Sequence, residues 1–260
     1  MDQPRSLTIS RRGVASLIGG GLAAPFVVKA SAFAQGKSAA APKVVELFTS
    51  QGCSSCPPAD ALMLNLAEAK SGILPLTFAV EVWDYLGWRD TLAKPLFTAR
   101  QKAYAAKLAE SRVYTPQAII NGRAHCVGSD RARLETLARD TGEAGQASLA
   151  ITQQEADEWR IEASGTAEMR VFMLPVAARK TVPIGRGENS GRTITYANVV
   201  RGIEERGGLG GAEPARFTLS RADLARQEAD CAAILVQAGT LAAPGKVFAA
   251  GFIKTGEGRA

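Results

Sequence analysis

Two of the chain's four cysteines, Cys53 and Cys56, are separated by two serines and followed directly by two prolines. This spacing is compatible with three kinds of chemistry. Two residues between the sulfurs let one thiol attack a substrate disulfide while the second resolves the mixed disulfide. A cysteine pair can also hold a metal ion, or it can close a disulfide with a purely structural role. The pattern therefore leaves a redox dithiol, a metal clip and a structural disulfide open.

The N-terminal segment, residues 1–34, indicates the compartment in which these thiols are found. Two arginines (11–12) precede an apolar run over 14–28, which is shorter than the roughly 20 residues needed to span a bilayer. An A-x-A cleavage pattern follows at 32–34. We interpret residues 1–34 as an export signal peptide of twin-arginine type, with an ordinary secretory signal as the alternative. The mature protein is expected to be periplasmic or secreted, without stable membrane insertion, where disulfides persist.

The remaining charge and the histidine content exclude several classes of function. The chain has 31 basic and 25 acidic residues, of which residues 1–34 hold four basic and one acidic. The rest carries a net charge of +3 and no dense run of lysine or arginine, so nothing indicates nucleic-acid binding. His125 is the single histidine, which argues against His-rich zinc sites and most Ser-His-Asp hydrolases. We therefore assign no metal ligand and no cofactor, and interpret His125 as a hydrogen-bonded structural residue.

A predicted βαβ unit positions Cys53. Residues 43–48 are an apolar run rich in β-branched residues, residues 59–70 have an apolar helical stripe, and residues 74–82 are a second apolar run. The right-handed crossover makes the two strands parallel, so their C-terminal ends share the sheet edge where open α/β sheets place their sites. The cysteine loop and the segment WDYLGW (83–88) both leave the strands at this edge.

A helix, a hairpin and another helix are expected next. Residues 94–110 carry an apolar helical stripe. Over 117–127, an Asn-Gly turn separates two short apolar runs and predicts a β-hairpin directly after Thr115 and Pro116. A last helix is expected to follow, with Ser129 or Asp130 capping its N-terminus.

The resulting order, βαβ-α-ββα over residues 43–145, resembles the thioredoxin fold. More narrowly, the motifs VVELFTSQGCSSCPPADALM, WDYLGW, VYTPQ, VGSDR and RGENSGRTIT are similar to those of DUF1223, a bacterial secreted family with a thioredoxin-like fold and no established activity. The resemblance implies a cis bond between Thr115 and Pro116, which would line the substrate side of the dithiol. It also implies that Glu46 is a buried proton acceptor for the resolving thiol, with a pKa that burial raises toward neutrality. A solvated Glu46 in a surface crevice is the alternative.

Residues 147–260 have a different pattern. Short strand-like runs recur at roughly 10–15-residue spacing, separated by glycine-rich turns. This pattern predicts a β-rich, sandwich-like C-terminal domain packed on the first domain. The segment IGRGENSG (184–191) superficially suggests a phosphate loop, but no helix pattern with a P-loop lysine follows it. We interpret it as a hairpin loop.

The predicted function is thiol–disulfide exchange with exported protein thiols. Cys53 is expected to attack and Cys56 to resolve, since backbone N–H groups and the helix dipole stabilise a Cys53 thiolate. One feature weakens this, because Pro57 disfavours an α conformation at Cys56 and the helix would begin later. The alternatives are a non-catalytic binding module with a structural Cys53–Cys56 disulfide, and a copper-handling protein with His125 as third ligand.

The aromatic residues of 83–88 lie where the dithiol is expected. Trp83, Tyr85 and Trp88 would form an apolar platform for an unfolded or extended polypeptide. The alternative is a hydrophobic lid that closes the core. The sequence leaves both roles open.

The remaining two cysteines, Cys126 and Cys231, are expected to form a second disulfide. An oxidising compartment disfavours free thiols, and a bridge that closes so long a loop would stabilise the protein by ~4 kcal/mol in the chain-entropy model. Such a bridge would fasten the second half of the chain to the first.

Overall fold

The computed structural model describes residues 43–69, 71–110, 112–141, 146–211 and 213–255. The expected signal peptide, residues 1–34, lies outside this part of the chain. Within the described ranges, no helix is both long enough and apolar enough to cross a membrane.

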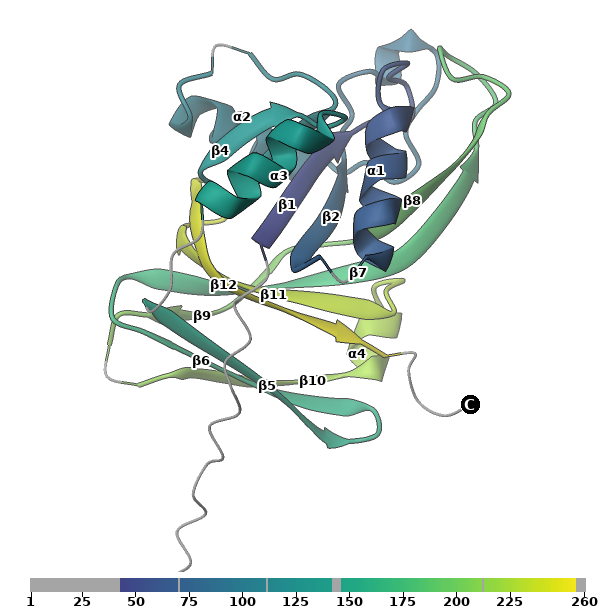
Figure 1. Cartoon of the computed structure of the whole chain (residues 1–260). Helices are drawn as coiled ribbons and strands as arrows, with labels where there is room; N and C mark the ends of the chain where they lie inside the picture. Colours follow the sequence, from purple (N-terminus) through teal and green to yellow (C-terminus); the bar gives the residue numbers. More distant parts are fainter. Residues whose placement is uncertain (1–42, 70, 111, 142–145, 212, 256–260) are drawn as a thin grey trace, which may run out of the picture. The chain divides into compact units, whose positions relative to one another are not determined.

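The first half has the predicted order of elements (Figure 1). Strands β1 and β2 are parallel, whereas β3 is antiparallel to both β1 and β4. The predicted βαβ unit and the predicted hairpin are therefore confirmed. The elements are β1 (Lys43–Thr49), α1 (Pro57–Glu68), β2 (Ile73–Ala79), the short 3-10 helix η1 (Asp84–Leu86), α2 (Pro95–Lys107), β3 (Gln117–Ile120), β4 (Ala124–Val127) and α3 (Arg131–Asp140).

Strand β1 is buried on both faces because helices cover each of them. Val45 and Leu47 pack with side chains of α1 and α3, which lie together on one side of β1 in Figure 1. Val44 and Phe48 pack on the opposite face, in the cluster that contains Phe97 and Tyr104 of α2. Since successive side chains of a strand alternate between faces, every second residue of β1 points toward α2.

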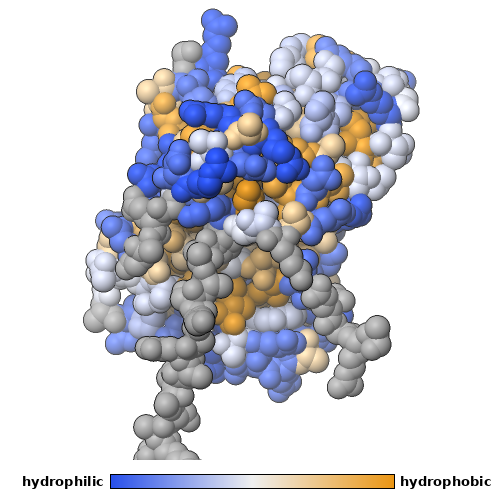
Figure 2. All heavy atoms as spheres, viewed as in Figure 1, coloured by the Kyte–Doolittle hydropathy of each residue, from blue (hydrophilic) through white to orange (hydrophobic). Residues whose placement is uncertain are grey.

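Helix α3 shows how the outer surface is separated from the core. Leu134, Leu137 and Ala138 are buried, while the arginines of this helix are exposed. Figure 2 shows the corresponding hydrophilic surface over α3. Of the two expected caps, Ser129 and Asp130, it is Asp130 that accepts the N–H of Arg133 and caps the N-terminus of the helix.

The second half adds strands to the same sheet. Its order is β12-β11-β7-β8-β2-β1-β3-β4, and β9 also pairs with β7. The two expected domains, 43–145 and 147–260, are therefore joined by one continuous sheet, and the described residues belong to one compact unit. The elements are β5 (Ala147–Glu155), β6 (Glu158–Gly165), β7 (Met169–Pro183), β8 (Thr193–Val200), β9 (Glu204–Leu209), β10 (Ala215–Ser220), α4 (Arg221–Ala225), β11 (Cys231–Gly239) and β12 (Pro244–Lys254).

The junction between the two halves is the contact of β8 with β2. Thr77 and Val199 are the paired positions of these parallel strands. Side chains reinforce the contact, because the Thr77 hydroxyl donates to Ala197 O at 2.7 Å and Asn198 Nδ2 donates to Pro75 O at 2.9 Å. Both hydrogen bonds are buried, so the junction is part of the core.

A separate three-stranded sheet, β10-β6-β5, packs on the large sheet. Trp159 and Ile161 of β6 lie in one apolar cluster with Val171 of β7, Ile234 of β11 and Ile253 of β12. Figure 1 shows this layer on the side of β11 and β12 away from α1. The second half thus supplies strands to two packed sheets, where a self-contained sandwich was expected.

Candidate functional site at the cysteine loop

The cysteine pair lies in the loop between β1 and α1. Cys53 and Cys56 form a disulfide with their Cα atoms 5.4 Å apart, so the predicted pairing is confirmed. Cys56 is fully buried, whereas 4 % of Cys53 is exposed. A partner molecule that approaches from solvent therefore meets Cys53 first.

Helix α1 begins directly after Cys56. This residue has φ −79° and ψ −35°, and its carbonyl oxygen accepts from Ala59 N–H at 2.9 Å and Asp60 N–H at 3.1 Å. The expectation that Pro57 keeps Cys56 out of the α region is therefore wrong. A turn in which Cys56 N–H donates to Cys53 O at 3.2 Å fixes the backbone, and Pro57 occupies a position that needs no N–H donor. Cys56 lies at the positive end of the helix dipole.

Thr115 and Pro116 lie beside this turn, and their peptide bond is cis, as predicted. Ser55 Oγ is 3.3 Å from Cys53 Sγ and donates to Thr115 O at 3.5 Å. The Thr115 hydroxyl accepts from the Trp83 indole N–H at 2.7 Å. The structure therefore brings Thr115, Trp83 and the cysteine turn together at one edge of the sheet.

The aromatic segment 83–88 is divided between the two roles considered for it. Tyr85 is 74 % exposed, and its ring centroid is 6.1 Å from that of Trp83. Trp88 packs against a buried apolar cluster, and its indole N–H donates to Gln51 Oε1 at 2.8 Å. Trp88 therefore helps to close the core, whereas Trp83 and Tyr85 present an apolar surface near Thr115.

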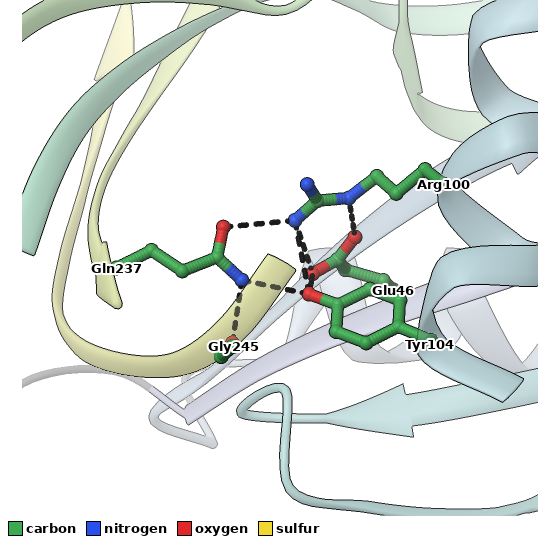
Figure 3. A network of polar contacts seen from close by, with 5 residues as sticks. All are labelled: Glu46, Arg100, Tyr104, Gln237 and Gly245. Atoms are coloured by element: carbon green, nitrogen blue, oxygen red, sulfur yellow. Dashed lines mark hydrogen bonds and ion pairs between the residues drawn. The ribbon is translucent and has the colours of Figure 1, made fainter. Parts of the chain in front are cut away.

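Glu46 is buried, but it points away from α1 and the cysteine pair. Figure 3 shows its carboxylate held by Arg100 of α2, through Nε at 2.6 Å and Nη2 at 2.9 Å, and by the Tyr104 hydroxyl at 2.6 Å. Gln237 of β11 binds both Arg100 and Tyr104. Because α1 and α2 cover opposite faces of β1, Glu46 is the partner in a structural ion pair. This corrects both the predicted proton acceptor and the alternative of a solvated acid.

A different buried acid, Asp60, lies one helical turn after Cys56. Asp60 is 2 % exposed. Its two oxygens and the neighbouring Thr49 hydroxyl make no hydrogen bond of normal geometry within the described residues. Burial raises the pKa of Asp60 to about 8, against a lowering contribution from the Thr49 hydroxyl and with a smaller raising contribution from the charge of Asp90. Since residues four apart share a helix face, Cys56 and Asp60 lie on the same buried side of α1.

Asp90 is a second buried acid, and it holds the cysteine loop directly. One of its oxygens accepts the Gln51 N–H at 2.8 Å, and the other accepts two backbone N–H groups of residues 92–93. Burial outweighs these three donors and raises the pKa of Asp90 to about 6. Burial, then the charges of Asp60 and Asp90, also raises the pKa of Tyr196 in β8. The three side chains form a buried titratable cluster beside the loop.

The tip of the β7–β8 hairpin, residues 184–192, reaches the same loop from the second half of the chain. The side chain of Asn189 is buried, and its Nδ2 donates to Gln51 O at 3.0 Å and to Cys53 O at 2.8 Å. The interpretation of 184–191 as a hairpin loop is confirmed. Its contact with the cysteine loop was not predicted, because nothing in the sequence indicates how far the hairpin extends.

The expected bridge between Cys126 and Cys231 is absent, and both residues are buried free cysteines. Cys126 packs with α1 and α3 on one face of the large sheet, whereas Cys231 lies in the cluster of α2 on the opposite face. The sheet separates the two sulfurs, so the prediction is wrong. Burial raises the pKa of Cys126 to about 11 and that of Cys231 to about 12.

His125 is hydrogen-bonded through both ring nitrogens, in agreement with the structural interpretation. Nδ1 is 2.9 Å from the Tyr114 hydroxyl, and Nε2 is 2.8 Å from Glu110 Oε1. Across the described ranges, no three His, Cys, Asp or Glu side chains form a group suited to a metal ion. Both ring nitrogens of His125 therefore contact side chains other than the cysteine pair.

Two solved structures are similar to this chain. A crystal structure of a protein from Agrobacterium tumefaciens, determined by the Northeast Structural Genomics Consortium, is 30% identical, has a TM-score of 0.71, and matches over 85% of this chain and 98% of that chain. HBP35 of Porphyromonas gingivalis is 12% identical with a TM-score of 0.53, over 84% of this chain and 76% of that one, which is a likeness of fold alone.

The cysteine loop, the aromatic segment and the hairpin tip all fall within the part of the chain that a family model recognises. A comparison with curated proteins finds no match. The family model for proteins of unknown function, DUF1223, matches residues 44–237. These residues include every element around the cysteine loop, and the chain therefore belongs to the DUF1223 family.

Proposed function

We propose that this protein is a thiol–disulfide oxidoreductase with a thioredoxin-like fold, which acts on exported protein thiols in the periplasm or outside the cell. The observation that carries this proposal is the disulfide at the start of α1, in which Cys53 is slightly exposed and Cys56 is buried. The signal-like sequence over 1–34 supports the location. Thr115, which contacts Ser55 and Trp83, and the aromatic pair Trp83–Tyr85 supply a surface for the partner beside Cys53.

The exchange proceeds in two balanced steps. A thiolate of a reduced partner attacks Cys53 Sγ, the Cys53–Cys56 bond breaks, and Cys56 leaves as a thiolate. A second thiolate of the same partner then attacks the partner's sulfur in the mixed disulfide. This step forms the partner's disulfide and releases Cys53 as a thiolate. Two electrons pass from the partner to the protein, and the reverse sequence reduces a partner disulfide. The helix dipole at Cys56 stabilises the thiolate that leaves in the first step.

In the reducing direction, Cys56 must lose its proton before it can attack the mixed disulfide. We infer that Asp60 accepts this proton. The carboxyl group lies one helical turn from Cys56, is buried with it, and has no competing hydrogen bond of normal geometry in the described structure. Because burial raises the pKa of Asp60 to about 8, only the ionised fraction of Asp60, which grows as the pH rises toward 8, can accept the proton. That pKa is close to the pKa of an ordinary thiol, so proton transfer to the ionised form is nearly balanced.

A second candidate function is a binding module in which the cysteine pair is a structural disulfide. The low exposure of Cys53 favours this candidate, because a catalytic sulfur must come into contact with its partner. The two functions differ in whether Cys53, once freed from Cys56, reacts with a disulfide.

The test is a Cys56→Ser variant incubated with oxidised glutathione. If the pair is a redox centre, Cys53 attacks and a glutathione adduct accumulates, because the resolving thiol is missing. Mass spectrometry of the intact protein and of its peptides locates the adduct. Cys53→Ser is the matched control, and it should form no adduct because Cys56 is buried.

The opposite result is equally clear. A folded Cys56→Ser protein in which Cys53 neither forms the adduct nor is alkylated at pH 7 would show that the disulfide is structural. The protein would then be a binding module.

A further inference from the structure

The tip of the β7–β8 hairpin contacts the backbone of the cysteine turn through two consecutive side chains. Glu188 Oε2 accepts the Ser54 N–H at 3.1 Å, and Asn189 Nδ2 donates to Cys53 O at 2.8 Å and to Gln51 O. Asn189 is 1 % exposed, whereas Glu188 is exposed to solvent. The buried, neutral Asn189 therefore holds the exposed, charged carboxylate of Glu188 against the Ser54 N–H, between the two cysteines.

The Ser54 N–H matters because few donors of this turn remain for a thiolate. The Cys53 N–H donates to Ser50 O at 3.1 Å, and the Cys56 N–H donates to Cys53 O at 3.2 Å. With Ser54 N–H bound to Glu188, three N–H groups of the turn already have acceptors. Backbone N–H groups at a helix start are the donors that lower the pKa of a cysteine, so their occupation disfavours the Cys53 thiolate.

We propose that Glu188 sets the reactivity of Cys53 by competing with its thiolate for the Ser54 N–H, and that Asn189 holds Glu188 in this position. This inference rests on the proposed redox function. It makes the hairpin tip of the second half a part of the site, in which Glu188 and Asn189 act as positioning residues.

Electrostatics gives the direction of the effect. The hydrogen bonds with Ser54 lower the pKa of Glu188, so its carboxylate is charged at neutral pH. When Cys53 becomes a thiolate, two negative charges face the same N–H donor. The competition raises the pKa of Cys53 and favours the disulfide over the reduced pair. Ser55 Oγ lies 3.3 Å from Cys53 Sγ, but its one hydroxyl proton is donated to Thr115 O, so it can serve the thiolate only by leaving that acceptor.

The test uses Glu188→Gln, which removes the charge and keeps an amide oxygen that can accept from Ser54. In a Cys56→Ser background, the pH dependence of alkylation by iodoacetamide reports the pKa of Cys53. The variant should increase the thiolate fraction of Cys53 at pH 7 by about two- to fivefold, the size of an exposed charge effect at a helix start. With Cys56 present, the equilibrium with glutathione should shift toward the reduced pair by a similar factor.

Two further variants separate this role from a merely structural one. Asn189→Ala should shift the Cys53 pKa in the same direction, and the Glu188→Gln/Asn189→Ala double variant should add little to either single change. Glu155→Gln, which removes an exposed carboxylate from the three-stranded sheet, is the matched control and should leave the Cys53 pKa unchanged. High salt should shrink the effect of Glu188→Gln, since ~1 M salt screens charges beyond about 3 Å.

An effect of Glu188→Gln no larger than that of Glu155→Gln overturns the inference. If Cys53 still forms the glutathione adduct in that case, the proposed function stands and only the role of the hairpin tip is lost. If Cys53 forms no adduct and resists alkylation in every variant, the proposed function and the inference both fail.

Discussion

Arg100 and Glu46 form a fully buried ion pair in which the guanidinium Nε and Nη2 contact both carboxylate oxygens. Glu46 belongs to β1 and Arg100 to α2, while Gln237 of β11 binds the same guanidinium at 3.0 Å. The pair therefore links the sheet strand that leads to the cysteine loop with a strand of the second half. Its role is structural, and its removal should destabilise both halves of the protein.

Replacing Arg100 by leucine should lower the free energy of unfolding by about 3–5 kcal/mol, because Glu46 is left as an uncompensated buried charge. The double variant Arg100→Leu/Glu46→Leu should lose less than Arg100→Leu alone, since neither charge then remains in the core. Denaturant unfolding measures both. Arg131→Gln, at the exposed pair with Glu135 on α3, is the control and should change stability by under about 0.5 kcal/mol. A double variant less stable than the single one would contradict this account.

The raised pKa of Asp60 predicts how the stability of the protein depends on pH. Its pKa is raised to about 8 in the folded protein from an ordinary value of 3.8, so the folded state retains a proton that the unfolded chain releases between these values. The contribution of Asp60 to stability is complete below its unfolded pKa and is lost as pH rises toward 8. In this window the loss is at most about 1.4 kcal/mol per pH unit.

An Asp60→Asn variant should therefore gain stability relative to the wild type as pH rises from 4 to 8. Denaturant unfolding at several pH values gives the difference. Exposed Asp140→Asn in α3 is the matched control and should follow the wild-type curve. A constant difference between Asp60→Asn and the wild type over this range would refute the raised pKa of Asp60.

The elements predicted correctly are those with local signals. The Asn121-Gly122 turn between two short apolar runs fixes the β3–β4 hairpin, and both residues have positive φ angles of 48° and 64°. The βαβ unit follows from the length and periodicity of three consecutive segments. The cysteine turn and Trp83 meet because the parallel strands β1 and β2 bring their C-terminal ends to one sheet edge, and Thr115 joins them because antiparallel β3 begins at that edge.

What could not be predicted depends on contacts between distant segments. The pairing of β8 with β2 joins the two halves, yet the sequences of both strands are compatible with many partners. The burial of Asp60 also depends on contacts between distant segments. An acid in the first turn of a helix ordinarily stabilises the helix through its dipole while the carboxylate stays exposed to solvent. Glu46 could be assigned to a buried strand, but which helix covers its face is decided by the tertiary fold.

The free state of Cys126 and Cys231 predicts a specific thiol count. Unfolded protein that has not been reduced should be alkylated at these two positions only, because Cys53 and Cys56 are joined. After reduction, all four cysteines of the chain should react. Mass spectrometry after alkylation in denaturant distinguishes the cases. Protein that takes up no label before reduction would contain the Cys126–Cys231 bridge.

Folded protein should protect both free thiols, because they are buried and burial raises their pKa values to about 11 and about 12. Alkylation at pH 7 should therefore be slow in the native state and fast in denaturant, since the thiolate is the reactive species. Rapid native labelling of Cys126 would show that the edge strand β4 opens.

The proton-acceptor role of Asp60 predicts which step of the reaction fails when it is replaced. In reduced Asp60→Asn protein, attack by Cys53 on a disulfide should keep its wild-type rate, whereas resolution by Cys56 should slow by at least about tenfold, as when a general base is removed. The mixed disulfide should then accumulate in acid-quenched samples analysed by mass spectrometry. Glu68→Gln, at the exposed C-terminal end of α1, is the control. A variant that merely loosened the loop would alter both steps, so a mixed disulfide that fails to accumulate, or equal slowing of the two steps, would exclude Asp60 as the proton acceptor.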